Sequence, residues 1–293
     1  MRIVLLALAV VAGFVFAVEC FLYALRRYEV AASGEGGGRR RGLLNVTGSF
    51  LTQVAATELL TIVCRLLGFV WPFRLAPDGD RTPVVFVHGY GGSPANFLWL
   101  AWLLRRRGFP ALAAIGYPPF GGSVLDKARR LAEGVEGVLE RTGASRVDLV
   151  AHSLGGIVAR LYLRELGGAR RVRRLVTLGT PHQGTRVAAL SPDPLARSLS
   201  PGSRLLGDLA REDPVPVLVP VVSIFSTFDA KLLPARNGVY PGAMNIEVDG
   251  IGHDAMLFSP RIATLVAESL ARPPVSPTNE NPKTGSGQQA SVS

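Results

Sequence analysis

Apolar positions along this chain form two long runs first and then a series of short ones. The first run, from Ile3 to Leu25, contains a single charge, Glu19, and is long enough to cross a bilayer as a helix, which takes about 20 apolar residues. The second run, from Phe50 to Trp71, is interrupted by polar residues at a spacing that leaves one apolar helical face. The pattern therefore predicts a membrane-associated N-terminal part.

From about residue 78 onward, short apolar runs alternate with amphipathic stretches. The short runs predict buried strands at 82–87, 111–115, 147–150, 172–178, 217–225 and 244–248. The amphipathic stretches predict helices at 94–107, 124–139, 157–163 and 262–270. Strands that alternate with helices predict an α/β fold, in which a mainly parallel sheet is covered by helices on both faces.

Shifts in composition divide the chain into five segments. In order, these are an anchor or signal-like segment (1–27), a flexible basic linker (28–49), an amphipathic apolar helix (50–77), the α/β domain (78–272) and a disordered tail (273–293). Within the α/β domain, the Pro- and Ser-rich insertion 187–214 is a candidate cap.

Composition supports a membrane-associated protein. The chain is 48% hydrophobic with a mean hydropathy of +0.28, which is high for a soluble protein. Its formal charge of +10 comes from scattered arginines with one run, 39–41, and no interleaved aromatic residues. This distribution argues against nucleic-acid binding and favours an anionic lipid surface. Cys20 and Cys64 both lie in the apolar N-terminal region, so they indicate little about the redox compartment.

The stretch Val-Asp-Leu-Val-Ala-His-Ser-Leu-Gly-Gly at 147–156 contains the candidate nucleophile. A predicted strand leads into Ser153, small residues flank it at Ala151 and Gly155, and an apolar helix follows. This is the context of a nucleophile elbow, Gly-x-Ser-x-Gly, with alanine in place of the first glycine. The pentapeptide alone also fits an ordinary turn with a solvated serine, but the flanking strand and helix favour the nucleophile.

A serine nucleophile needs a base and an acid that orients the base. Of the four histidines, His253 lies in a glycine-containing loop after the last predicted strand, where the order serine, acid, histidine places the base. Asp229 follows the penultimate strand and is the favoured acid, whereas Asp249, closer to His253 in sequence, is its rival. The backbone N–H groups of Tyr90 and Leu154 are the expected oxyanion donors.

Four motifs carry a family resemblance: Val-His-Gly-Tyr-Gly-Gly (87–92), Ala-His-Ser-Leu-Gly-Gly (151–156), Leu-Gly-Thr-Pro-His-Gln-Gly (178–184) and Pro-Gly-Ser (201–203). Over about 81–272 the chain resembles bacterial triacylglycerol lipases of the α/β-hydrolase superfamily, and its alanine elbow is similar to that of the small Bacillus-type lipases. The resemblance implies a triad at Ser153, Asp229 and His253 and an oxyanion hole at Tyr90 and Leu154. It also implies that His182 is structural. No cofactor is expected and no metal-ligand cluster is visible, although some larger lipases carry a structural calcium.

The expected function is a serine ester hydrolase, a lipase or esterase, acting on lipid or other acyl esters at a membrane surface. Acyl transfer or thioester hydrolysis with the same triad is one alternative. A non-catalytic, membrane-anchored binding module is another, and its signature would be a lost triad member. Six leucines of the candidate cap either line an acyl pocket or cover the sheet edge: Leu190, Leu195, Leu199, Leu205, Leu206 and Leu209. The sequence indicates neither the acyl-chain length, the head group nor the oligomeric state.

The N-terminal run favours an uncleaved anchor in a bacterial inner membrane, because it continues past the candidate cleavage site at 15–17. The alternative is a signal peptide cleaved before Val18 and a secreted protein. More arginines follow the run than precede it, which keeps the next domain cytoplasmic by the positive-inside rule. A secreted lipase needs the opposite side, so the side stays open, as does a second span at 50–71.

Overall fold

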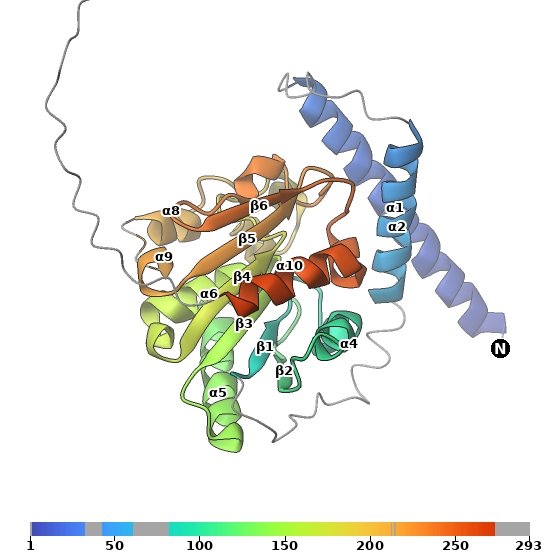
Figure 1. Ribbon diagram of the computed structural model, residues 1–293. Helices are drawn as coiled ribbons and strands as arrows, with labels where there is room; N and C mark the ends of the chain where they lie inside the picture. Colours follow the sequence, from blue (N-terminus) through green and yellow to red (C-terminus); the bar gives the residue numbers. More distant parts are fainter. Residues whose placement is uncertain (1, 33–42, 61–81, 212, 214, 273–293) are drawn as a thin grey trace, which may run out of the picture.

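The computed structural model describes residues 2–32, 43–60, 82–211, 213 and 215–272, in which an α/β body stands beside two N-terminal helices (Figure 1). Six strands form one sheet in the order β2-β1-β3-β4-β5-β6, and every neighbouring pair is parallel. The strands are β1 (Val84–Val87), β2 (Leu112–Ile115), β3 (Val147–His152), β4 (Val172–Leu178), β5 (Val221–Ser226) and β6 (Met244–Val248). The predicted α/β fold with a mainly parallel sheet is confirmed.

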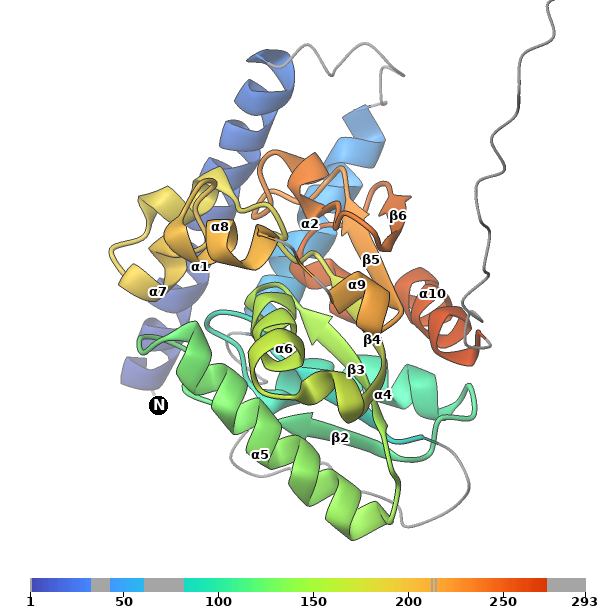
Figure 2. The same cartoon turned by 90° about the vertical axis from the view of Figure 1, so that its left-hand side faces the viewer.

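Helices cover both faces of the sheet (Figures 1 and 2). One face carries α5 (Val124–Thr142) and α6 (Leu154–Glu165), and the other carries α4 (Leu98–Arg105) and α10 (Pro260–Ala271). Successive side chains of a strand point to opposite faces, so Val85 packs beneath α5 and α6 while Phe86 packs beneath α4 and α10. The central strand β1 is apolar throughout because both of its faces are buried, whereas the edge strand β6 is largely exposed.

The described residues of the Pro- and Ser-rich connection from β4 to β5 form four short helices. They are η5 (Arg186–Leu190), α7 (Pro194–Arg197), α8 (Arg204–Ala210) and α9 (Val215–Leu218). Leu195, Leu199, Leu206 and Leu209 are buried against the α5–α6 side of the sheet, whereas Leu190 is exposed. The strand expected from residue 217 therefore starts later, at Val221, because α9 takes its first residues.

Other element bounds differ from the predicted ones by a few residues. The helix expected over 94–107 is a 3-10 turn, η3 (Pro94–Phe97), that continues as α4. The helix expected from residue 157 starts at Leu154, directly after the elbow serine. Three further 3-10 turns lie in loops: η4 (Gly168–Arg170), η6 (Ala235–Gly238) and η7 (Asp254–Phe258).

The N-terminal helices are α1 (Arg2–Ala32) and α2 (Leu43–Glu58), which lie side by side next to the body (Figure 1). The linker expected over 28–49 is wrong at both ends, because 28–32 continue α1 and 43–49 begin α2. The two helices pack against each other, and the Tyr23 hydroxyl of α1 donates to the Ser49 carbonyl of α2 at 3.4 Å. Residues 33–42, the stretch of the second helix beyond residue 60, and the predicted tail lie outside the described residues.

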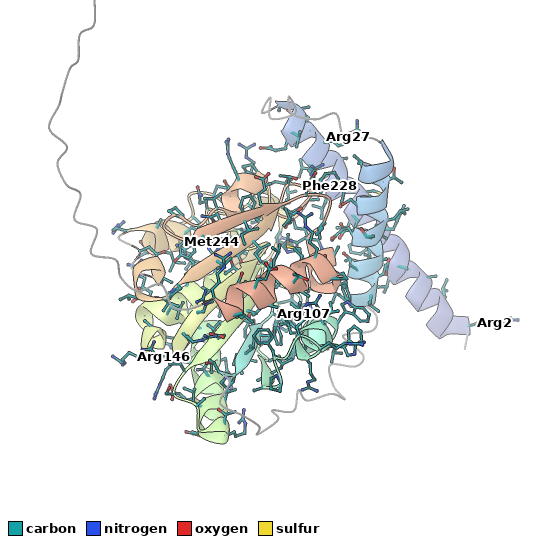
Figure 3. The ribbon with its side chains drawn as sticks, viewed as in Figure 1. Arg2, Arg27, Arg107, Arg146, Phe228 and Met244 are labelled. Carbon is teal, nitrogen blue, oxygen red and sulfur yellow. The ribbon has the colours of Figure 1, made fainter. Side chains whose placement is uncertain are left out.

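The two halves of α1 have different surroundings. Its N-terminal half extends past the body to Arg2, while Arg27 lies at the end near Phe228 (Figure 3). Exposed apolar side chains follow the helix up to residue 21: Leu6, Val10, Val11, Phe14, Phe16, Val18 and Phe21. Beyond them, Leu22 and Tyr23 pack against Ala230 of the body. By length and composition, Ala9–Ala32 could cross a membrane, a test that a signal sequence also passes.

Candidate active site

Ser153 occupies the sharp turn between β3 and α6. Among the residues that the structure describes, it is the one non-glycine residue with positive φ (φ 56°, ψ −126°). Such a conformation costs on the order of 1–3 kcal/mol and persists where the surrounding structure enforces it. Here a Cβ at Gly155 would lie 2.3 Å from the Val87 carbonyl oxygen, so only glycine lets α6 approach β1 this closely. The local sequence thus forces the elbow.

His253 and Asp229 form a close pair in the loops that follow β6 and β5. The Nδ1 atom of His253 lies 2.6 Å from Oδ2 of Asp229, and the carboxylate is fully buried. Its other oxygen accepts from the backbone N–H groups of Lys231 at 2.8 Å and Leu232 at 2.9 Å. The rival Asp249 is exposed and accepts from the Thr227 hydroxyl at 2.8 Å. The contact to His253 is thus made by Asp229.

His253 is also the one histidine of the four whose pKa is raised. Burial lowers its pKa, but the Asp229 carboxylate outweighs burial and moves the pKa above the ordinary 6.5. Burial lowers the pKa of His88 to about 4 and that of His152 to about 3, and it holds the pKa of His182 well below the ordinary value. A general base must take up a proton near the operating pH, and the lowered pKa values of the other three histidines disfavour that role for them.

Two of the other histidines, His182 and His152, have close contacts within the core. His182 stacks on Tyr240 with ring centroids 4.3 Å apart, and its Nε2 lies 3.0 Å from the Thr177 hydroxyl. His152 Nε2 lies 3.2 Å from the carbonyl oxygen of His253. These contacts suit supporting roles, in keeping with the structural role that the resemblance implies for His182.

The two candidate oxyanion donors come from different elements, the start of α6 and the loop after β1. Leu154 is the first residue of α6, so its N–H belongs to the helix terminus that attracts negative charge. Tyr90 lies in the loop after β1, and Gly89–Gly92 line the same cavity as Ser153. The Tyr90 hydroxyl donates to Asp193 at 2.9 Å, which ties this loop to the start of α7.

The profile of the alpha/beta hydrolase family matches residues 84–277. The chain belongs to this family. A triacylglycerol lipase from Burkholderia plantarii is 32% identical to it over 135 residues, covering 42% of this chain and 37% of that protein. One from Pseudarthrobacter phenanthrenivorans is 32% identical over 123 residues, covering 39% and 38%. The matched segment spans well under half the length of either relative.

Among solved structures, the mature form of Bacillus licheniformis lipase BlEst2 has a similar fold. It matches with a TM-score of 0.58 at 22% identity, covering 67% of this chain and 94% of that one. At this identity, the likeness shows the fold of the hydrolase and nothing further.

The hydrolase holds a cavity of about 320 Å³ at the elbow, lined by both Ser153 and His253. Of the six cap leucines considered above, Leu199 lines this cavity; the η5–α7 region adds Val187, Ala188, Ser191 and Ala196. The N-terminal helices supply three further lining residues, Leu22, Thr57 and Leu60. This wall is not predicted from the sequence, in which its one signal is Glu19, a charge in an otherwise apolar run.

Three side chains of the hydrolase could offer ligand atoms to a cation. His152, His253 and Asp254 place such atoms within 4.8 Å of one another. Two of the three are already engaged, His253 by Asp229 and Asp254 by the Lys231 ammonium at 2.5 Å. A cation here would compete with both contacts, so the donor set fits a hydrogen-bonded site better than a metal centre.

Proposed function

We propose that this α/β hydrolase is a serine ester hydrolase that cleaves carboxylic esters, foremost lipid esters, through an acyl-enzyme. One observation carries the proposal. Ser153, on a strained elbow, shares a cavity with His253, whose Nδ1 atom contacts the buried Asp229 carboxylate. That is the arrangement by which a weak nucleophile is activated at neutral pH.

In the proposed reaction, the Oγ of Ser153 attacks the ester carbonyl while His253 takes its proton. Asp229 holds the imidazole in the tautomer with the proton on Nδ1 and stabilises the imidazolium that forms. The N–H groups of Leu154 and Tyr90 stabilise the tetrahedral oxyanion. The alcohol leaves with the proton from His253, and a water activated by the same base then releases the acid.

The cavity lining supports an acyl chain as part of the substrate. Its apolar lining includes Leu22 and Leu60 from the N-terminal helices and Val187, Ala188 and Leu199 from the connection between β4 and β5. Apolar walls bind a hydrocarbon chain through the surface they remove from water. The relatives named triacylglycerol lipases support the same substrate class.

We also propose that α1 anchors the enzyme in a membrane, its catalytic domain on the cytoplasmic side. The helix from Arg2 to Val18 precedes the buried Glu19 and is about 25 Å long, close to the ~30 Å hydrocarbon thickness of a bilayer. Leu22, one turn further, lines the cavity. The cavity then lies at the membrane surface, within reach of lipid esters.

A panel of p-nitrophenyl esters of increasing chain length tests the function. The native protein should hydrolyse them with saturation kinetics, and Ser153→Ala should reduce turnover to background with its circular dichroism unchanged. Ser191→Ala is the matched control, because Ser191 lines the same cavity and has no proposed part in catalysis. Turnover that persists in Ser153→Ala would contradict the assignment.

A further inference from the structure

Helix α2 lies directly against the loop that carries His253. The hydroxyl of Ser49 donates to the carbonyl oxygen of Gly250 at 2.7 Å, three residues before the histidine. Ser49 is buried, so water competes little for this bond. This bond from α2 therefore holds the loop segment that leads into His253.

Gln53, one turn further along α2, binds the two residues that follow His253 in the loop. Its Oε1 accepts from the backbone N–H groups of Asp254 at 3.0 Å and Ala255 at 3.3 Å. These are N–H groups at the start of η7, which have no partner within their own helical turn. A Cβ at Gly252 would lie 2.4 Å from the same Oε1, so glycine permits this approach. The loop around His253 is therefore held on both sides.

Gln53 itself is fixed by charged groups in a buried network. Its Nε2 lies 3.3 Å from Oε1 of Glu19 on α1 and 3.2 Å from Oδ2 of Asp254. The Lys231 ammonium lies 3.1 Å from the Glu19 carboxylate and 2.5 Å from that of Asp254. Glu19 and Gln53 are each 1% exposed, so the amide has little freedom to turn away.

The same network reaches the partner of the histidine. The backbone N–H of Lys231 donates to the Asp229 carboxylate, while its side chain pairs with Asp254. Burial opposes both charges of that pair, but their attraction outweighs it, lowering the pKa of Asp254 and raising that of Lys231. The pair stays charged at neutral pH and joins the two loops that hold His253 and Asp229.

We propose that the α1–α2 helix pair is part of the catalytic apparatus: Ser49 and Gln53 position His253, and Glu19 with Lys231 holds Gln53 in place. All four are positioning residues, because each acts through the loop or another side chain. The inference rests on the proposed function, since it requires His253 to be the base. It gives the helix pair a task that a simple anchor does not have.

Gln53→Leu tests this inference in the full-length protein with a short, water-soluble ester. Leucine keeps the side chain's bulk but accepts no hydrogen bond from the loop. Because a misplacement of about 1 Å can cost a factor of about 100, we expect kcat to fall by about 10- to 100-fold. KM should change little, and the downfield proton resonance of the His253–Asp229 hydrogen bond should broaden. The rate of fluorophosphonate labelling should fall in parallel with kcat.

The matched control is Glu29→Gln, which breaks another contact between α1 and the body, the 2.6 Å ion pair with Arg186. It should keep the native kcat and the native resonance. Ser49→Ala removes a single hydrogen bond, so it supplies the decision if Gln53→Leu does not fold. We expect a smaller loss of kcat in that variant, again at an unchanged KM.

A folded Gln53→Leu and a folded Ser49→Ala that both keep the native kcat would overturn the inference, as would a loss confined to KM. Either result leaves the proposed function intact, provided that the native protein still hydrolyses the ester. Failure of the proposed function is distinct, because the native protein itself would then neither hydrolyse esters nor react with a fluorophosphonate.

Discussion

The α/β body and the N-terminal helix pair line one cavity, but they are specified in different ways. In the body, Ser153 is oriented by its immediate neighbours, since small residues and a strand-to-helix turn produce the elbow locally. In the helix pair, Glu19 and Gln53 are held by contacts with Lys231 and Asp254, which lie about two hundred positions later in the chain. The helix that we propose as an anchor thus also lines the cavity of the candidate active site.

The largest expected effect in the body after loss of the nucleophile follows Asp229→Asn. The amide stabilises the wrong imidazole tautomer, so kcat should fall by a factor on the order of 10⁴, with little change in KM. Steady-state kinetics on a soluble ester measure the effect. Asp249→Asn is the control and should stay near the native rate, because Asp249 is exposed and bonded to Thr227. If Asp249→Asn shows the large loss instead, the acid is misassigned.

The next effect is on pH dependence. Because Asp229 outweighs burial and raises the pKa of His253 above 6.5, the base remains protonated and inactive at pH values where a free histidine is neutral. The acid limb of kcat/KM should therefore have its midpoint above pH 6.5 and fall about tenfold per pH unit below it. In Asp229→Asn the remaining activity should show a lower midpoint, since burial then acts without the carboxylate. A midpoint below 6.5 in the native protein would contradict this electrostatic account.

The smallest effect on chemistry should follow deletion of residues 2–17. This deletion removes the exposed apolar half of α1 but leaves Glu19, Leu22 and Arg26 in place. Turnover of a soluble short ester should be unchanged, while membrane retention through a carbonate wash should fall. Loss of turnover in this variant would mean that the two halves of α1 cannot be separated.

The N-terminal residue of the native protein shows whether the exposed half of α1 is retained. An uncleaved anchor keeps its first residues, whereas signal cleavage gives a start at Val18, and in both cases the contacts of Glu19 survive. N-terminal sequencing distinguishes these outcomes. Protease added to intact spheroplasts should spare the catalytic domain if it lies on the cytoplasmic side, and digestion would place it on the other.

The predictable part of the fold is the part in which each segment carries its own signal. Strand β4 has its predicted bounds of 172–178, because its apolar and β-branched residues mark a strand in the local sequence alone. The insertion before β5 was harder, since Pro- and Ser-rich sequence suits loops and short helices equally well. Consequently, α9 occupies residues expected to begin a strand.

The candidate site divides in the same way. Ser153, Asp229 and His253 could be proposed from their order along strands of a known topology, and the close His253–Asp229 contact is consistent with that proposal. The residues of the helix pair could not be proposed in this way, because the partners of the buried glutamate are distant in sequence and only the fold brings them together. The hydropathy pattern predicts a membrane span around Glu19, whereas this residue is buried in the structure and paired with Lys231.

The most direct test of the account is to map the site of a fluorophosphonate adduct on the full-length native protein. After brief labelling at neutral pH and digestion, mass spectrometry should find one stoichiometric adduct, on Ser153, because only a base-activated serine attacks phosphorus rapidly. The absence of an adduct on folded protein, or an adduct on another serine of the cavity such as Ser191, would contradict the account.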